Sequence, residues 1–224
     1  MAWLLEKVAD TFAGGDVPGD RLLDVGTRPA IHNLISPARC FRSITCAEFC
    51  QANRVEVEKW VRDDGDAFDW DPIIKYVCKL EGTGNWKERK EALRNAIEAV
   101  VFCDVREKNP LGALTSDPYD VVSSVFTLCG VAKDRPDFSA VVSNVASLVK
   151  PGGTMVLVCD FGVTYYTDGT STYPHCVLDA PYVKQVVEEN GFGDVKDDVF
   201  LYTTPCPHSD AKGLVYVTAR KLEE

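Results

Sequence analysis

Acidic residues follow the first three apolar runs that we predict to be strands. Asp24 precedes Gly26 at the end of the first run, and Glu48 stands 22 residues after Gly26, beyond the second run. Asp104 follows the third run. Nucleotide-binding folds place a carboxylate at about this distance from the first glycine turn, where it holds ribose hydroxyls. Because ligands of open α/β sheets bind beyond the carboxyl ends of the strands, the pattern favours an adenosine-bearing ligand.

The same residues narrow the choice of ligand. The sequence lacks a Gly-x-Gly-x-x-Gly motif, which counts against a dinucleotide and favours S-adenosylmethionine, whose amino and carboxylate ends one loop can hold. Each residue also has a plain structural interpretation, with Gly26 as a turn, Glu48 as a solvated loop acid and Asp104 as a turn-former. These interpretations stay open for the single residues. The repetition after successive strands is what favours a binding site.

The predicted elements alternate between strands and helices. Helices are expected over Ala2–Phe12, around Val55–Val61, over residues 85–100, over Pro136–Val149 and around Ala180–Asn190, while residues 63–84 read as irregular. Strands are expected over Leu22–Val25, Ser43–Ala47, Val100–Cys103, Tyr119–Val125, Thr154–Cys159, Asp194–Tyr202 and Gly213–Ala219. Alternation predicts an α/β fold with a mostly parallel sheet covered on both faces, and the last two strands predict an antiparallel hairpin at its edge. We expect a single domain over residues 1–224.

Composition excludes several classes of function. The 224 residues include 34 Asp plus Glu and 24 Lys plus Arg, so the net charge is -10, which argues against nucleic acid and against an anionic membrane surface. No apolar run is long enough to span a bilayer. The nine cysteines are odd in number and form no Cys-x-x-Cys pair, so we expect no metal site and a cytoplasmic location.

The middle of the sequence carries the most specific pattern. The segments Glu58–Arg62, Ala67–Trp70 and Tyr76–Gly82 closely resemble the nicotinamide, phenylethanolamine and indolethylamine N-methyltransferase family, as do Lys150–Gly153 and Tyr165-Tyr166. The likeness extends from Leu22 to Leu222. The resemblance implies a Rossmann-like S-adenosylmethionine-dependent methyltransferase fold with a seven-stranded sheet. It also implies a transferase that methylates the nitrogen of a small amine or pyridine.

The resemblance assigns provisional roles to individual residues. The methionine end of the cofactor would meet Gly26 and Thr27, the ribose would meet Glu48 and Asn53, and the adenine would meet Asp104 and Val105. Ser124 would lie beside the amino group, and His32 stands where the family has a tyrosine near the cofactor. The position of Asp24 before Gly26, apart from the resemblance, predicts that it orients the loop or meets an ammonium group. Asp160 and Tyr166 are the candidates for substrate binding. No residue is assigned as catalytic with certainty.

Several positions depart from the family. Arg28 replaces the second glycine of the first loop, where a positive φ would cost a side chain roughly 1 kcal/mol. Its guanidinium would either pair with the cofactor carboxylate or occupy its place. The family acid at the end of the fifth strand aligns with Cys159, next to Asp160. Thr127, Leu128 and Cys129 occupy the region of a second family acid. The N-terminal segment that closes over the ligands is expected to be missing, which would leave a cleft open to self-association.

Three functional hypotheses therefore compete. An active small-molecule N-methyltransferase is favoured by the acids at the strand ends. A truncated or degenerate member that binds cofactor weakly, or is inactive, is favoured by Arg28. The third is an interaction module that keeps the fold. Asp160 is equally well explained as a loop-capping acid, Tyr166 as packing of its loop, and His175 is expected to be a surface loop residue.

Overall fold

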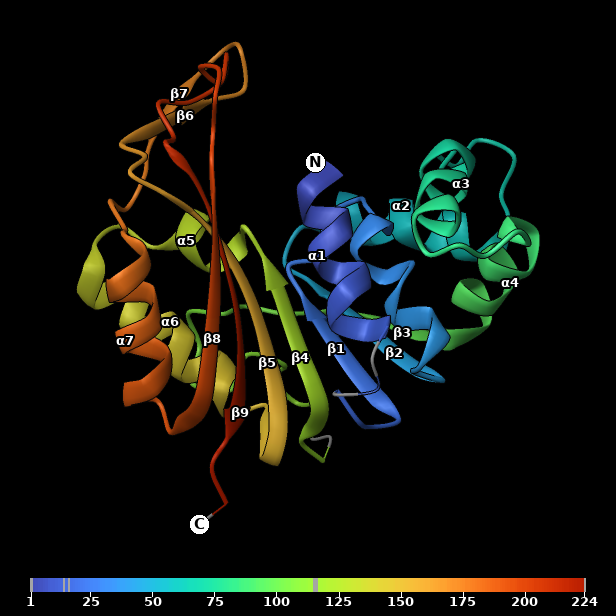
Figure 1. Cartoon of the computed structure of the whole chain (residues 1–224), viewed down its shortest axis with the longest axis horizontal. Coiled ribbons are helices and arrows are strands. Elements are labelled where there is room, and N and C mark those ends of the chain that lie inside the picture. The colour runs from blue at the N-terminus through green and yellow to red at the C-terminus, as the bar shows by residue number, and fades with distance from the viewer. Residues whose placement is uncertain (1, 14, 16, 115–116, 224) are drawn as a thin grey trace. The chain divides into compact units, whose positions relative to one another are not determined.

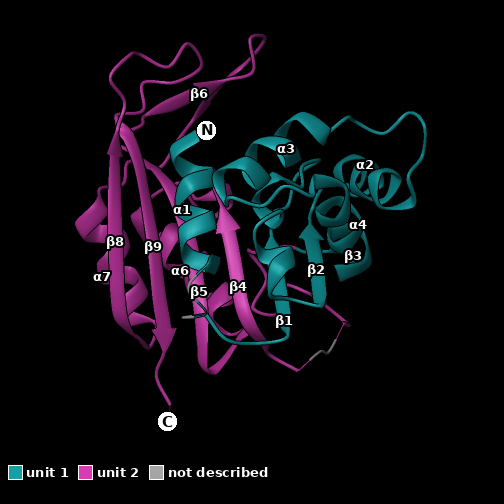
Figure 2. Ribbon diagram, turned by 45° about the vertical axis from the view of Figure 1, so that its right-hand side comes forward, with its two compact units in different colours: residues 1–103 teal, residues 104–224 magenta. Residues whose placement is uncertain are grey.

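The computed structural model of the chain describes residues 2–13, 15, 17–114 and 117–223. It divides into two compact units, residues 1–103 and 104–224, which Figure 2 shows in teal and magenta. The boundary falls between Cys103 and Asp104, directly after the third strand.

The first unit combines a parallel sheet with helices (Figure 1). Its elements are α1 (Ala2–Ala13), β1 (Arg21–Val25), β2 (Ser43–Glu48), α2 (Gln51–Arg62), α3 (Asp71–Leu80), α4 (Trp86–Ala96) and β3 (Ile97–Phe102), with two short 3-10 turns at His32–Leu34 and Pro37–Arg39. Leu5, Val8 and Phe12 of α1 are each 3% exposed, and their helical spacing puts one apolar stripe on the core. The predicted helix over Ala2–Phe12 is confirmed.

The strands of this unit run parallel in the order β3-β2-β1. Val25 pairs with Ala47, and Glu48 pairs with Phe102. Because neighbouring parallel strands end at the same edge, the residues that follow β1, β2 and β3 lie along one edge of the sheet. Leu22, Leu23 and Ile44 are fully buried, as expected for strands covered on both faces.

Two predictions for this unit are wrong. Residues 63–84 are not irregular throughout, because α3 occupies Asp71–Leu80 and buries Ile74, Val77 and Cys78. The charged helix ends at Ala96 rather than Val100, and β3 begins at Ile97. Ile97 is 6% exposed and pairs with Ile44 of β2, so burial in the sheet overrides the helical propensity of the preceding charged run.

The second unit contains the remaining elements (Figure 1). These are β4 (Tyr119–Val125), α5 (Thr127–Val131), α6 (Arg135–Ala146), β5 (Val149–Phe161), β6 (Tyr165–Thr167), β7 (Thr172–Pro174), α7 (Ala180–Glu189), β8 (Phe192–Leu201) and β9 (Gly213–Lys221). Its sheet has the order β4-β5-β9-β8, with β4 parallel to β5 and the pairs β5–β9 and β8–β9 antiparallel. Helices α6 and α7 pack against each other and against these strands. The predicted edge hairpin is confirmed.

The Pro-Gly-Gly segment lies inside a strand and not between a helix and a strand as predicted. Helix α6 ends at Ala146, and β5 already begins at Val149. Tyr119 pairs with Val149 whereas Val121 pairs with Thr154, so the residues in between bulge out of the ladder. A Cβ on Gly153 would come 2.9 Å from the Asp120 carbonyl oxygen. Glycine therefore permits the close approach of β4 to the bulge.

One helix and one hairpin of this unit were not predicted. The short helix α5 turns back immediately after β4, and the strands β6 and β7 form a small antiparallel hairpin in the segment expected to be a polar loop. The backbone N–H of Thr167 donates to the carbonyl of His208 at 2.8 Å. This bond ties the hairpin to the β8–β9 connection, beyond the Leu201 end of β8 (Figure 1).

The α/β class is confirmed. Apart from the β6–β7 hairpin, the first unit contributes three strands and the second four, and the pairings within each unit are parallel except those that involve β9. None of the helices among the described residues has the length and apolar character needed to cross a membrane.

The start of β9 gives a test of this packing. Gly213 pairs with both Phe161 and Leu201, and a Cβ there would overlap the Phe200 carbonyl oxygen and lie 2.9 Å from a Phe161 ring carbon. We expect Gly213→Ala to lower the free energy of unfolding by about 1–3 kcal/mol, measured by urea denaturation. The control Gly130→Ala has open space around its Cβ. An equal effect of the two substitutions would contradict this view of the β8–β9 hairpin.

Candidate functional site

The turn after β1 folds back onto β2. Gly26 has a φ of 75°, and the backbone N–H groups of Gly26 and Thr27 donate to the Ala47 carbonyl at 2.7 and 3.4 Å. The Thr27 hydroxyl donates to the Asp24 carbonyl at 3.0 Å. Asp24 is 3% exposed and Thr27 is 4% exposed. The predicted methionine-end residues are thus part of one rigid turn at the edge of the sheet.

Glu48 joins this turn to the start of α2. One of its carboxylate oxygens accepts from the backbone N–H of Arg28 at 2.8 Å. The other accepts from the Cys50 N–H at 2.8 Å and from the Asn53 amide at 3.1 Å. Glu48 is only 6% exposed, so it is not the solvated loop acid of the alternative interpretation. A carboxylate offers about four acceptor sites, which leaves room for a ligand hydroxyl.

Arg28 occupies the strained conformation that the sequence suggested. Its φ is 57°, in the left-handed region that costs an L-residue about 1–2 kcal/mol. The backbone hydrogen bond to Glu48 helps to hold it there. The side chain is exposed, and its positive charge reaches His32, where it is one of the causes of a lowered pKa.

His32 is a buried side chain whose polar atoms lack partners. It is 8% exposed and stacks on Trp70, with ring centroids 5.6 Å apart and an interplanar angle of 27°. Neither ring nitrogen has a hydrogen-bond partner. Burial, and next the Arg28 charge, lower the pKa of His32 to about 4. The ring is therefore neutral near pH 7, with one donor and one acceptor nitrogen available to a ligand.

Two exposed aromatic rings lie at the same strand edge. Phe49 follows β2 and Phe102 ends β3, and they are 62% and 48% exposed with centroids 5.5 Å apart. The guanidinium of Arg54 lies 5.4 Å from the Phe102 ring centroid. Sequence reasoning did not select these residues, although each is an aromatic side chain at the end of a predicted strand. Together they form an exposed apolar surface, and Phe102 pairs with Glu48 in the β2–β3 ladder.

In the second unit, the loop that begins at Asp104 is held by local hydrogen bonds. The Asp104 carboxylate accepts from the Arg106 N–H at 3.0 Å, and the Asp104 N–H donates to the Pro110 carbonyl at 2.9 Å. The Val105 carbonyl accepts from Asn144 at 3.0 Å. These contacts agree with the turn-forming interpretation of Asp104, and they leave an adenine-binding role as a prediction. Ser124 lies within β4 and is 1% exposed.

The two predicted substrate residues have different surroundings. Asp160 lies near the end of β5. Burial of Tyr202, and next the charge of Asp160, raise the pKa of Tyr202. Tyr166 lies on β6 and is 39% exposed. Its ring stacks on Tyr173 at 5.1 Å and meets His175 edge-on at 6.2 Å.

His175 is not the surface residue that we predicted. It is 9% exposed, and its Nδ1 lies 3.0 Å from the Cys176 carbonyl oxygen. Among the described residues, no group of three or more His, Cys, Asp or Glu side chains is arranged to hold a metal ion.

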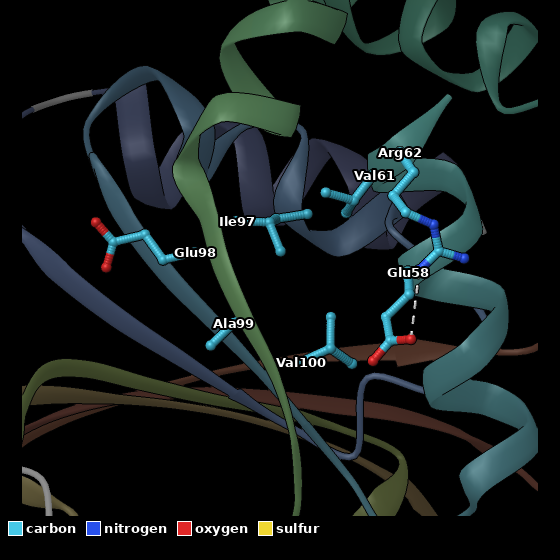
Figure 3. Close-up of a pocket in the computed structure, with 7 residues that line it drawn as sticks. All are labelled: Glu58, Val61, Arg62, Ile97, Glu98, Ala99 and Val100. Atoms are coloured by element: carbon cyan, nitrogen blue, oxygen red, sulfur yellow. Dashed lines mark ion pairs between the residues drawn. The ribbon is translucent and has the colours of Figure 1, made fainter. Parts of the chain in front are cut away.

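A small groove in the first unit is separate from these residues. Figure 3 shows that it is lined by α2 and β3, with Glu58 and Arg62 paired at 3.6 Å along one side. Its volume is about 160 Å³, below the roughly 300 Å³ at which small-molecule sites begin. We assign no cofactor to it.

The neutral state of His32 makes stability depend on pH. Well above pH 6.5 His32 is neutral in both the folded and the unfolded chain, so it adds no pH dependence there. As the pH falls from 6.5 towards 4, the unfolded chain binds the proton first, and stability falls by up to about 3 kcal/mol. We expect His32→Phe, which keeps the stacking on Trp70, to lose less stability than the unmodified chain between pH 7 and pH 4.

Urea denaturation at pH 7, 5 and 4 checks this expectation. His208→Gln is the matched control, because His208 is exposed, and it should follow the unmodified chain. The same pH dependence in His32→Phe and in the unmodified chain would show that folding does not lower the pKa of His32.

Comparisons with known proteins agree with the sequence prediction. The family model described as the NNMT/PNMT/TEMT family matches residues 1–222. Human nicotinamide N-methyltransferase is 34% identical over 220 residues, covering 98% of this chain and 83% of that protein. Bovine phenylethanolamine N-methyltransferase is 35% identical over 98% of this chain and 79% of its own length. Rabbit indolethylamine N-methyltransferase is 32% identical, covering 97% of this chain and 83% of that protein.

Solved structures confirm the fold. A magnesium protoporphyrin IX methyltransferase from Synechocystis, solved with bound S-adenosylmethionine, matches with a TM-score of 0.57 and 14% identity over 98% of this chain and 78% of that one. An S-adenosylmethionine-dependent methyltransferase from Methanosarcina mazei matches with a TM-score of 0.60 and 15% identity, covering 92% of this chain and 94% of that one. The Rossmann-like methyltransferase fold, and S-adenosylmethionine as the methyl donor of the family, are confirmed. The chain belongs to the NNMT/PNMT/TEMT family of N-methyltransferases.

Proposed function

We propose that this chain transfers a methyl group from S-adenosylmethionine to the nitrogen of a small amine or pyridine. The match of the family model over residues 1–222 carries the proposal. The names of the relatives, which include nicotinamide and phenylethanolamine N-methyltransferases, support this acceptor class. The first unit supports binding of this cofactor, because it offers the glycine turn at Gly26 and the buried carboxylate of Glu48. It also offers the buried His32 ring, whose nitrogens have no hydrogen-bond partner.

The residues of the first unit fit the parts of this cofactor. Glu48 and Asn53 would hold the ribose hydroxyls, while the turn at Gly26 and Thr27 would meet the methionine end. His32 would satisfy its free ring nitrogens on a polar group of the ligand, which removes the cost of leaving them buried and unpaired. The bound cofactor supplies a methyl group on a positively charged sulfur.

Further contacts of the cofactor stay proposals. The exposed ring pair Phe49 and Phe102 would offer its apolar surface to the adenine. Asp104 and Val105 are proposed at the adenine edge, Ser124 at the amino group, and Asp24 as the acid that orients the first turn. The guanidinium of Arg28 would pair with the carboxylate of the methionine end. Its positive charge already helps to lower the pKa of His32, which is also proposed to contact the cofactor.

On the acceptor side, the chain must present a nitrogen lone pair and exclude water. A pyridine has a free lone pair, so positioning is sufficient. A protonated amine must first lose a proton, for which Asp160 is the proposed acceptor. Tyr166, stacked on Tyr173, would form a wall for a flat acceptor.

Two features of the biological setting are also proposals. All nine cysteines are free thiols, which supports a reducing compartment and a cytoplasmic location. Self-association and a single domain over residues 1–224 stay predictions.

The Glu48 carboxylate gives the sharpest test of cofactor binding. A hydrogen bond to a charged group contributes about 1.5–3 kcal/mol, so Glu48→Gln should weaken S-adenosylhomocysteine binding at least about tenfold in calorimetric titrations. Glu58→Gln is the control, because Glu58 lies on α2 in an exposed pair with Arg62, and its affinity should not change. Equal affinities of the two variants would show that Glu48 does not bind the cofactor. Thermal denaturation of both variants checks that the fold is intact.

The Arg28 side chain separates the active from the degenerate hypothesis. If it pairs with the cofactor carboxylate, Arg28→Gly should weaken S-adenosylmethionine binding about threefold, in line with an exposed ion pair, and Arg28→Lys should retain most of the affinity. We expect the unmodified chain to transfer radiolabelled methyl groups to at least one of nicotinamide, phenylethanolamine and tryptamine. Tighter binding by Arg28→Gly, with no transfer by the unmodified chain, would favour the degenerate hypothesis instead.

A further inference from the structure

Arg54, in the first turn of α2, has no part in the proposed function, although its side chain lies at the strand ends of the candidate site. Its Nη1 donates to the backbone carbonyl of Glu48 at 2.8 Å and to that of Phe49 at 2.6 Å. The guanidinium carbon lies 5.4 Å from the centroid of the Phe102 ring, which is within the range of a cation–π contact. One side chain thus contacts the end of β2, the residue after it and the end of β3.

The short connection between β2 and α2 brings Arg54 to this place. Strand β2 ends at Glu48 and α2 begins at Gln51, so only Phe49 and Cys50 join the two elements. The backbone N–H of Arg54 donates to the Cys50 carbonyl at 3.1 Å, which is the first backbone hydrogen bond of the helix. Because helical side chains point towards the N-terminus of their helix, that of Arg54 lies back over this connection.

The helix itself does not favour a cation at this position. The N-terminus of a helix carries a partial positive charge, so the helix dipole repels a guanidinium in the first turn. The carbonyl oxygens of Glu48 and Phe49 carry partial negative charges at hydrogen-bond distance, and the face of an aromatic ring such as Phe102 is also negative. The charge of Arg54 is therefore compensated at the strand ends, and this compensation holds the guanidinium there.

The two carbonyl bonds fix the backbone just beyond the sheet. Glu48 and Phe102 are the last residues paired between β2 and β3, so the carbonyl groups of the following connection need other donors. The carbonyls of Glu48 and Phe49 are related by the φ and ψ angles of Phe49. Because one nitrogen of Arg54 binds both carbonyls, it restricts these angles. The Glu48 side chain and the Phe49 ring therefore keep a fixed relative placement.

The same guanidinium bears on both halves of an adenosine site. The buried Glu48 carboxylate is the proposed partner of the ribose hydroxyls. The Phe49 and Phe102 rings, with centroids 5.5 Å apart, are the proposed surface for the adenine, since aromatic side chains stack on bases. Arg54 contacts Phe49 through the backbone and Phe102 through the ring. Its contacts thus link the carboxylate to the ring pair.

We propose that Arg54 is a positioning residue for the adenosine end of the cofactor site. Its guanidinium holds the Glu48 carboxylate and the ring pair of Phe49 and Phe102 in an arrangement that one adenosine contacts at the same time. The inference rests on the proposed binding of S-adenosylmethionine. It adds that the affinity for this cofactor depends on a side chain whose own partners belong to the protein.

Calorimetric titration of the whole chain with S-adenosylhomocysteine tests the proposal. Arg54→Met keeps a long apolar side chain but removes the donors and the charge, so we expect binding to weaken about tenfold, as is typical when a hydrogen bond from a charged group is lost. Arg54→Lys keeps the charge and a donor and should recover part of this loss. Arg62→Met is the matched control, because Arg62 lies on the same helix in exposed ion pairs with Glu58 and Asp64. Its affinity should equal that of the unmodified chain.

A double-mutant cycle distinguishes positioning from a general loss of stability. If Arg54 acts through Glu48, the double variant Arg54→Met/Glu48→Gln should bind within about threefold of Glu48→Gln alone. Independent effects would multiply, and the double variant would then bind about tenfold more weakly than Glu48→Gln. Thermal denaturation of each variant checks that the fold is retained. Should Arg54→Met fail to fold, Arg54→Gln, which keeps an amide donor without the charge, replaces it in every comparison.

The outcomes separate this inference from the proposed function. If the unmodified chain binds S-adenosylhomocysteine and Arg54→Met binds it equally well, the positioning role is wrong and the proposed function stands. The same conclusion follows if the losses in the double variant multiply, or if Arg54→Lys binds no better than Arg54→Met. If the unmodified chain does not bind S-adenosylhomocysteine, the proposed cofactor is wrong, and this inference is wrong with it.

Discussion

The hydrogen bonds of the Glu48 carboxylate set the geometry of the first unit's candidate site. One side chain at the end of β2 accepts from the turn after β1 and from the start of α2. Because it is 6% exposed, its charge must be compensated by donors of the chain itself. The same bond holds Arg28 at a φ of 57°. The residue that would bind the ribose therefore also maintains the loop that would bind the methionine end.

Much of the fold could be predicted because it depends on local patterns. The apolar runs of β1, β2, β4 and β9 and the stripe of α1 were found near their true positions. Helix α3 was not predicted because the aromatic residues around it make its segment read as irregular. Pro72 in its first turn and the buried Ile74, Val77 and Cys78 would have identified it. The bulge at Lys150–Gly153 could not be foreseen, since its cause is the register with Tyr119 and Val121.

Part of the candidate site could likewise be predicted from local patterns, and part could not. The positions of Gly26 and Glu48 follow from strand ends and from parallel pairing, and the structure brings these residues together with Asn53. The burial of His175 could not be predicted, because a single histidine in a polar segment carries no periodic signal. Its surroundings depend on the turn at Phe126 and on the β6–β7 hairpin, and short elements of this kind are specified by tertiary contacts.

The two units surround their buried imidazoles in different ways, and this difference bears on what each ring can do. In the first unit burial, and next the Arg28 charge, lower the pKa of His32, and its ring nitrogens have no hydrogen-bond partner. In the second unit Nδ1 of His175 lies 3.0 Å from the Cys176 carbonyl oxygen, so the backbone already engages one ring nitrogen. A neutral ring with free nitrogens suits recognition of a ligand by hydrogen bonds. A ring bonded to the backbone instead helps to hold its own segment in place. The same residue type thus suits recognition in one unit and local structure in the other, according to the partner that each fold supplies.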